Sequence, residues 1–276
     1  MFKTAIGGAV LIGLAALVFA GCSTPVVEVP QSDVNPLAAG PDQEALPVPP
    51  DYVAEALEAS GGLSFWMQQK RLRADGVVKL YRSDDSFYLT QHDLEVYPWS
   101  NAIRIEANEP QARFVWQLAD GRYDVVEGDP PMDVSPMGGA YQTYADAVLR
   151  IVTAPVRLLD SEAELYREPT PIRIGGQWYQ KITAKYSPTQ NEVGVGGASA
   201  APYWTDAVYF LNREEGLIDM IWLGNATTQE FVVARGYDYS DVEEAGLRVP
   251  SKVEVFRADA DGGIRERLAQ LDVTGN

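Results

Sequence analysis

The sequence predicts an α+β protein: a curved antiparallel sheet, an incomplete β-barrel of about ten or eleven strands, closed by a central helix and a short N-terminal helix. Residues 140–160 carry the longest helical pattern of the exported chain. On both sides of them the hydrophobic period becomes two, with turn residues between the runs. No second linker or shift in composition follows Pro50, so we expect residues 51–276 to form one domain.

The central helix is predicted from apolar residues that recur at the spacing of one helix face. These residues are Tyr141, Tyr144, Ala145, Val148, Leu149 and Val152. Pro155 has no backbone N–H and clashes with the preceding turn. The regular helix is therefore expected to end near Thr153 or Ala154.

The N-terminus has the pattern of an export signal, predicted to span residues 1–21. A short positive segment that contains Lys3 precedes an apolar run, and Phe19-Ala20-Gly21-Cys22 follows at the expected cleavage point. This tetrapeptide resembles the bacterial lipobox, which implies that Cys22 becomes the acylated first residue of the mature chain. The alternatives are an ordinary secretory signal or a membrane-spanning helix, but the apolar run is short for a span of about 20 residues.

Cys22 is the only cysteine, so the exported domain can form no internal disulfide and no cysteine-based metal site. Residues 22–50 combine this lipidated cysteine with a proline-rich segment. Such a composition predicts a semi-extended tether between lipid and domain. Ser23 stands where the inner-membrane retention signal of enteric lipoproteins has aspartate. For a Gram-negative source we therefore expect an outer-membrane anchor that faces the periplasm.

The folded domain should begin with a short helix that has Asp51 as its N-cap and ends at Gly61-Gly62. Residues 63–69 are expected to add a further helical turn before the first strand. Four dipeptides or short runs are interpreted as turns between strands: Asp75-Gly76, residues 83–86, residues 108–110 and Asp120-Gly121. Residues 127–139 and 187–202 are predicted to be irregular loops.

Residues 203–211 and 217–223 form a predicted hairpin whose two strands are apolar on both faces. A sheet with one solvated face alternates apolar and polar residues, so we expect both faces to be covered here.

The composition argues against several classes of function. A formal charge of −17 disfavours binding to a phosphate backbone, and no basic stripe with interleaved aromatic residues is present, so no nucleic-acid partner is expected. His92 is the only histidine and is interpreted as a strand residue that faces solvent. No nucleophile motif or metal-ligand spacing stands out, and residues 259–263 are explained as a hairpin turn. The sequence therefore predicts neither an enzyme nor a cofactor.

Aromatic residues are frequent in the predicted strands, and ordinary core packing is the simplest reason. The sharper hypothesis is that a curved sheet leaves its concave face partly unfilled as a site for an apolar ligand. The residues predicted to line it are Trp116, Trp178, Phe210, Met220 and Trp222. The last three are assigned to one face by alternation across the hairpin turn, and a one-residue shift in register would reverse this assignment.

The order of these features resembles the outer-membrane lipoprotein-sorting (LolA/LolB-like) superfamily. The resemblance rests on the lipobox, the exit of the central helix at residues 155–160, residues 246–256 and residues 271–274. It implies an incomplete barrel with an apolar cavity that receives acyl chains, in a lipid-anchored member of the family. The leading hypothesis is a non-enzymatic envelope lipoprotein that binds an acyl chain, lipid or lipoprotein and is attached to the membrane by its N-terminal lipid. The alternative is an interaction or sensor lipoprotein of the same fold with a filled core.

Overall fold

The computed structural model describes residues 36–38, 40, 46, 48–108, 113–119, 122–128, 138–160, 163–186, 204–225, 228–242 and 246–275. Residues 35–276 form one compact unit. The predicted signal peptide, Cys22 and most of the tether lie outside the described residues. So do the turn at Asp120-Gly121 and nearly all of the two predicted loops.

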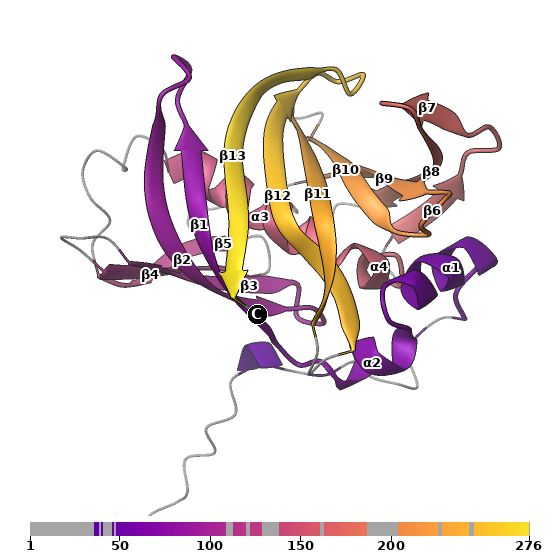
Figure 1. Cartoon of the computed structure of the whole chain (residues 1–276), viewed down its shortest axis with the longest axis horizontal. Helices are drawn as coiled ribbons and strands as arrows, with labels where there is room; N and C mark the ends of the chain where they lie inside the picture. Colours follow the sequence, from indigo (N-terminus) through magenta and orange to yellow (C-terminus); the bar gives the residue numbers. More distant parts are fainter. Residues whose placement is uncertain are drawn as a thin grey trace, which may run out of the picture. The chain divides into compact units, whose positions relative to one another are not determined.

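The described strands form one antiparallel sheet in the order β5-β4-β3-β2-β1-β13-β12-β11-β10-β9-β8-β6, and β7 pairs separately with β8 (Figure 1). The first group of strands is β1 (Leu72–Tyr81), β2 (Phe87–Tyr97), β3 (Ala102–Asn108), β4 (Arg113–Ala119) and β5 (Arg122–Glu127). The second group is β6 (Ala163–Arg167), β7 (Ile172–Ile174), β8 (Gln177–Tyr186), β9 (Asp206–Asn212), β10 (Ile218–Asn225), β11 (Glu230–Val242), β12 (Leu247–Ala258) and β13 (Ile264–Gly275).

The predicted fold class is confirmed: the sheet is curved, antiparallel and not closed into a barrel, because β5 and β6 remain at its two ends. The sheet has 13 strands among the described residues, more than the ten or eleven predicted. The strand β6 spans only 5 residues, which is too short for alternation to be recognised in the sequence.

The turn predicted at Asp75-Gly76 is wrong, because β1 runs through both residues. The pairing of β1 with β13 shifts register between Asp75 and Gly76, which marks a β-bulge. A Cβ atom on Gly76 would lie 2.5 Å from Cδ1 of Leu271 on β13. The glycine therefore permits the close approach of two strands and does not form a turn.

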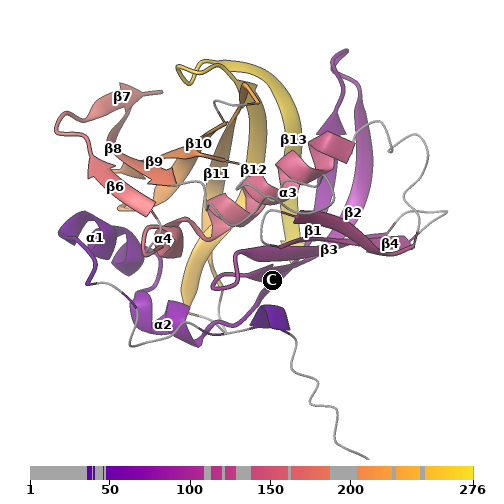
Figure 2. The ribbon, with the colours of Figure 1, turned by 180° about the vertical axis from the view of Figure 1, so that it is seen from behind.

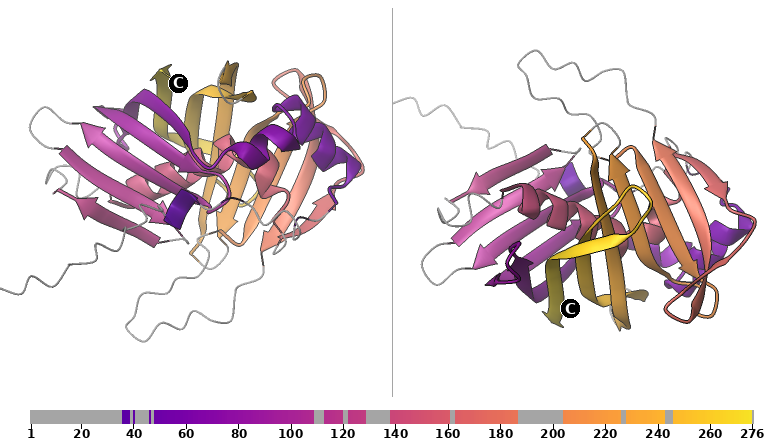
Figure 3. Two further views of the ribbon diagram at one scale, coloured as in Figure 1. Left: turned by 90° about the horizontal axis from the view of Figure 1, so that it is seen from below. Right: turned by 90° about the horizontal axis from the view of Figure 1, so that it is seen from above.

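The helices are η1 (Pro36–Ala38), α1 (Asp51–Ala59), α2 (Leu63–Gln68), α3 (Gly138–Val152) and α4 (Ala154–Arg157). The short N-terminal helix is confirmed, but Pro50 occupies its N-cap and Asp51 is the first helical residue. The central helix ends at Val152 as predicted, and Pro155 lies in the first turn of α4, where a missing N–H is tolerated. Figure 3 shows α1 on the side of the sheet that carries β6–β9.

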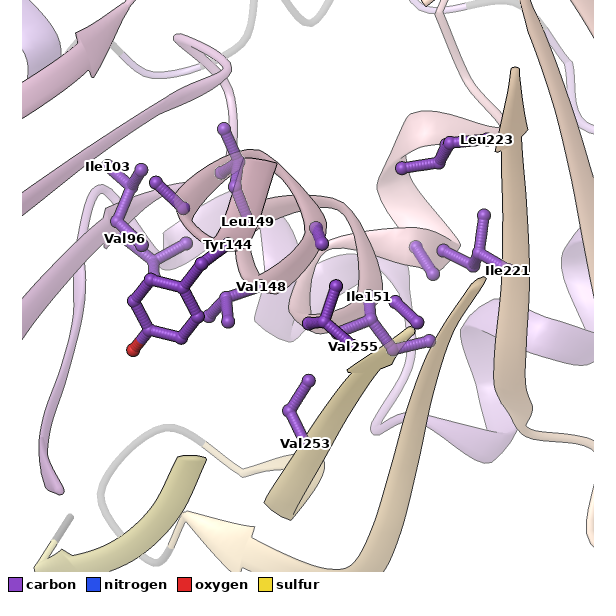
Figure 4. Packing of buried hydrophobic residues seen from close by; sticks show 14 of the residues in the cluster. Val96, Ile103, Tyr144, Val148, Leu149, Ile151, Ile221, Leu223, Val253 and Val255 are labelled. Atoms are coloured by element: carbon purple, nitrogen blue, oxygen red, sulfur yellow. The ribbon is translucent and has the colours of Figure 1, made fainter. Parts of the chain in front are cut away.

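The helix α3 lies across the concave side of the sheet (Figure 2), where it forms the centre of the core. Its Tyr144, Val148 and Ile151 meet side chains of β2, β3 and β10–β12, including Val96, Ile103, Ile221 and Val255 (Figure 4). The sheet curves far enough around α3 that polar helix residues are buried as well, among them Asp146 and Arg150. The single apolar stripe in the sequence therefore underestimates how much of this helix is enclosed.

The hairpin of β9 and β10 is covered on both faces, as its apolar pattern predicts. Tyr209, Ile221 and Leu223 face α3 and belong to the main core. On the opposite face, Met220, Val233 and Ala258 form a separate small cluster, against which Ile174, Phe210, Trp222 and Phe231 pack. The turn between β12 and β13 covers part of this outer cluster, because Nε1 of Trp222 donates to the carbonyl oxygen of Asp259 at 3.1 Å.

Candidate functional site

A small apolar cavity remains between α3 and the concave face of the sheet. Its volume is about 40 Å³, and its mouth opens where β1, β11 and β13 pass the C-terminal end of α3. All but one of the residues that line it are apolar: Leu72, Arg73, Ala74, Leu94, Val96, Val148, Val152, Val242, Val249, Pro250, Leu271 and Val273.

The residues around the mouth of this cavity are partly exposed, and the residues deeper inside are buried. Ala74, Val152, Val242 and Val273 have intermediate exposure, whereas Val148 is buried below them. Sites for small organic ligands usually measure about 300–1,000 Å³. The space present is therefore far smaller than an acyl chain requires, and α3 fills the rest of the concave face.

The five residues predicted to line a single cavity do not come together. Trp116 is buried in the main core and is absent from the lining of the cavity. Phe210, Met220 and Trp222 do share one face of the hairpin, as alternation predicts, but that face points away from α3. Trp178 lies 46% exposed at the start of β8. The pattern alone could not choose between the two apolar faces, because both are covered.

The interpretation of His92 as a solvent-facing residue is wrong, since its side chain is completely buried. Its imidazole ring lies between three aromatic rings, with centroid distances of 6.1 Å to Trp116, 6.3 Å to Tyr141 and 5.7 Å to Tyr144. Both ring nitrogens, Nε1 of Trp116 and the hydroxyl of Tyr144 have no hydrogen-bond partner among the described residues. The burial lowers the pKa of His92 to about 3, so the ring is neutral at physiological pH. The sequence does contain a signal for this burial, because His92 lies two residues before Leu94 and therefore on the same face of the strand.

A buried ion pair lies on α3, one helical turn from the aromatic cluster. Nε of Arg150 is 3.2 Å from Oδ1 of Asp146, and the guanidinium carbon is 5.6 Å from the centroid of the Tyr186 ring. The Tyr186 hydroxyl lies 3.1 Å from that of Tyr209. Burial is the largest single effect and opposes the charged form of Arg150, but Asp146, Tyr186 and Tyr209 together outweigh it and raise the pKa of the guanidinium. This arrangement anchors the Arg150 side chain between α3 and the strands β8 and β9.

The described residues contain no group of three or more His, Cys, Asp or Glu side chains placed to hold a metal ion. Among the same residues, no helix has both the length and the apolar character needed to cross a bilayer.

No family model and no curated protein matches the sequence. The solved structures to which the chain is similar include the following three. The first is a LolA superfamily protein from Nitrosomonas europaea, with 9% identity, 83% of this chain and 92% of that chain covered, and a TM-score of 0.45. The second is described as an outer membrane lipoprotein-sorting protein domain from Vibrio parahaemolyticus, with 9% identity, coverage of 74% and 83%, and a TM-score of 0.38. The third is a DUF1329 family protein from Desulfovibrio piger, with 9% identity, coverage of 81% and 90%, and a TM-score of 0.42.

Proposed function

We propose that this protein is a non-enzymatic lipoprotein of the cell envelope that binds an acyl chain or a similar apolar ligand between α3 and the concave face of its sheet. The observation that carries the proposal is the apolar cavity at the C-terminal end of α3. Eleven of its twelve lining residues are nonpolar, and its mouth is open to solvent. Apart from Arg73, which is exposed, no side chain that lines the cavity is polar, so an alkyl group can enter without the loss of a side-chain hydrogen bond inside it.

Ligand entry requires α3 to move away from the sheet. A volume of about 40 Å³ is far below the roughly 300–1,000 Å³ of most sites for small organic ligands. Burial of an alkyl chain gains about 0.8 kcal/mol per CH₂ group. The contacts of Val148 and Val152 with the strands are lost when the helix shifts, and contacts with the ligand replace them. The structure therefore represents the closed form of the proposed binding protein.

The test is the binding of a fluorescent fatty acid to the purified full-length protein. Val152→Trp places a large side chain at the partly exposed mouth, where it fills the entrance with little strain on the core. We expect it to weaken binding of the probe about tenfold or more, equivalent to at least 1.4 kcal/mol. Val126→Trp is the matched control, because Val126 is 52% exposed on β5 and lies outside the cavity.

A second candidate is an interaction or sensor lipoprotein that binds partners through its outer surface. It is favoured by the near-complete burial of α3, whose side chains occupy the site that a ligand would use. The same experiment separates the two functions. A wild-type protein that fails to bind the fatty acid, or equal binding by both tryptophan variants, would reject the apolar site and favour the second candidate.

A further inference from the structure

A second and larger pocket lies at the flank of the sheet that carries β7 and β8. It has a volume of about 460 Å³ and is lined by Thr170, Pro171, Trp178, Arg213 and Glu214. This volume falls within the range of about 300–1,000 Å³ that is usual for small-molecule sites. It shares no lining residue with the apolar cavity beside α3. The two pockets therefore have different walls and a different chemical character.

Trp178 provides an exposed aromatic surface in this pocket. Its side chain is 46% exposed at the start of β8, although tryptophan is a residue that proteins usually bury for the most part. The directly paired residue on β7 is Arg173, whose guanidinium carbon lies 6.0 Å from the Trp178 ring centroid. The cation helps to fix the ring, and the exposed part of the indole remains available to a ligand.

Arg213 and Glu214 place opposite charges next to each other at the turn between β9 and β10. Both side chains are exposed, and Arg213 has no ion pair with any residue that the structure describes. The Gln177 amide, in the orientation that satisfies both groups, donates to Oε2 of Glu214 at 3.0 Å. The pocket thus presents strong hydrogen-bond donors and acceptors side by side, with no net charge from this pair.

The turn that carries these two residues is held in place by backbone contacts. The Arg213 N–H donates to the Trp178 carbonyl oxygen at 2.9 Å, and the Glu214 N–H donates to Oδ1 of Asn212 at 3.0 Å. Gly216 closes the turn with φ of +72°, and a Cβ atom there would lie 2.9 Å from the Cβ of Ala59 on α1. The backbone that carries the charged pair and the indole ring is therefore fixed before any ligand arrives, which lowers the cost of binding.

We infer that this pocket is a binding site for an uncharged saccharide of one to three rings. An anion is attracted by Arg213 and repelled by Glu214, and a cation is attracted and repelled in the reverse way, so this neutral pair gives an ion no net attraction. Sugar hydroxyls donate and accept hydrogen bonds, so they match a neighbouring carboxylate and guanidinium at once. The electron-rich face of Trp178 attracts the weakly positive C–H groups on one side of a sugar ring.

The experiment is saturation-transfer NMR with the full-length protein in a detergent that has no sugar headgroup. The probes are the N-acetylglucosamine trimer and maltotriose. We expect at least one of them to bind with a Kd of about 1 mM, the range that corresponds to about −4 kcal/mol. Trp178→Ala should weaken this binding about tenfold, because it removes the stacking surface. Glu214→Gln should weaken it as well and leaves the indole in place.

Tyr166→Ala is the matched control, since Tyr166 is an aromatic residue that is 60% exposed on β6 and does not line the pocket. Fatty-acid binding, measured on the same samples, should be unchanged in all three variants, so this test is independent of the apolar site. Three outcomes would overturn the assignment: absence of saturation transfer from both probes, equal binding by wild type and Trp178→Ala, or preferential binding of glucuronate over the neutral sugars.

Discussion

His92 is buried in an aromatic cluster without a hydrogen-bond partner among the described residues, so its protonation is coupled to unfolding. The burial lowers the pKa of His92 from 6.5 to about 3. Between these values the unfolded chain binds a proton that the folded chain does not bind. The contribution of neutral His92 to the free energy of unfolding is therefore fully present above pH 6.5. It is lost as the pH decreases toward 3, with a slope of up to about 1.4 kcal/mol per pH unit.

We predict that His92→Phe removes this pH dependence. The free energy of unfolding of the wild type, measured by urea titration, should fall by about 2 kcal/mol more between pH 7 and pH 5 than that of His92→Phe. Carboxylates that titrate near pH 5 are common to both proteins and cancel in the difference. Parallel pH curves for the two proteins would show that His92 is accessible to protons in the folded state.

Single residues also show where the sequence was a poor guide to structure. Asp75-Gly76 has the composition of a hairpin turn. In the structure, Gly76 leaves room for the side chain of Leu271 on β13, almost 200 positions later in the sequence. His92 lies on the same strand face as Leu94 and Val96 and is buried with them, although its titratable side chain favours the prediction of a solvent-facing residue. For Gly76 long-range packing decided the outcome, and a local pattern carries no information about it. For His92 the alternation along β2 already indicated the buried face.

Among the structural elements, α3 combines an apolar surface with a buried ion pair. Asp146 and Arg150 have side chains that are only 7% and 9% exposed, and the amide carbonyls and apolar groups around them offer little solvation. We predict that Asp146→Ala costs about 3–5 kcal/mol of stability, because it leaves the guanidinium charge buried without its counter-ion. The double variant Asp146→Ala, Arg150→Met should recover most of this loss.

The control for this prediction is the pair Arg265–Asp259, at the turn between β12 and β13, with side chains 67% and 37% exposed. Removal of Asp259 should cost less than about 1 kcal/mol, as is usual for surface ion pairs. Urea unfolding of the single and double variants gives the coupling energy directly. A double variant as unstable as Asp146→Ala would mean that packing of the Arg150 stem, and not its charge, determines the cost.

The two faces of the β9–β10 hairpin have different neighbours, so we predict that substitutions on them have different effects. Ile221 is completely buried against the α3 side, so Ile221→Ala should cost about 2–5 kcal/mol. Phe210 is only partly buried in the outer cluster, so Phe210→Ala should cost about 1–2 kcal/mol and leave fatty-acid binding unchanged. Urea unfolding and probe binding measure both effects, and reduced probe binding in Phe210→Ala would contradict the assignment of faces.

The central helix, its end before Pro155 and the succession of strands were predictable, because each depends on a local period of hydrophobicity. The number of strands was underestimated, since β6 becomes recognisable only through its pairing with β8. The candidate cavity was not predictable residue by residue. Its walls come from β1, β2, α3 and β11–β13, and their meeting depends on the curvature of the sheet. No periodicity in one segment encodes that curvature.

At the scale of the whole molecule, the sheet has two unpaired ends, at β5 and β6, and α3 occupies the space between the curved faces. An open sheet of this kind can widen without the loss of strand pairing, and the side-chain contacts with α3 are among those that resist the change. This is the mechanical basis on which an apolar ligand could displace the helix in the function that we propose.

The final prediction concerns how the whole protein is attached to its membrane. Phe19-Ala20-Gly21-Cys22 resembles a lipobox, and Cys22 is the only cysteine in the chain, so no other thiol is available for acylation. Stable attachment by acyl chains needs more than one chain or a second signal, and the net charge of −17 provides no attraction to anionic lipid.

We therefore expect Cys22→Ala to abolish labelling by radioactive palmitate and to yield a soluble or signal-retaining form. Palmitate labelling and cell fractionation of the Cys22→Ala variant measure these two effects. Ser23→Ala is the control, because it keeps the acceptor thiol. Palmitate labelling that persists in Cys22→Ala would reject the lipobox, and recovery of the wild type with the inner membrane would reject the expected location.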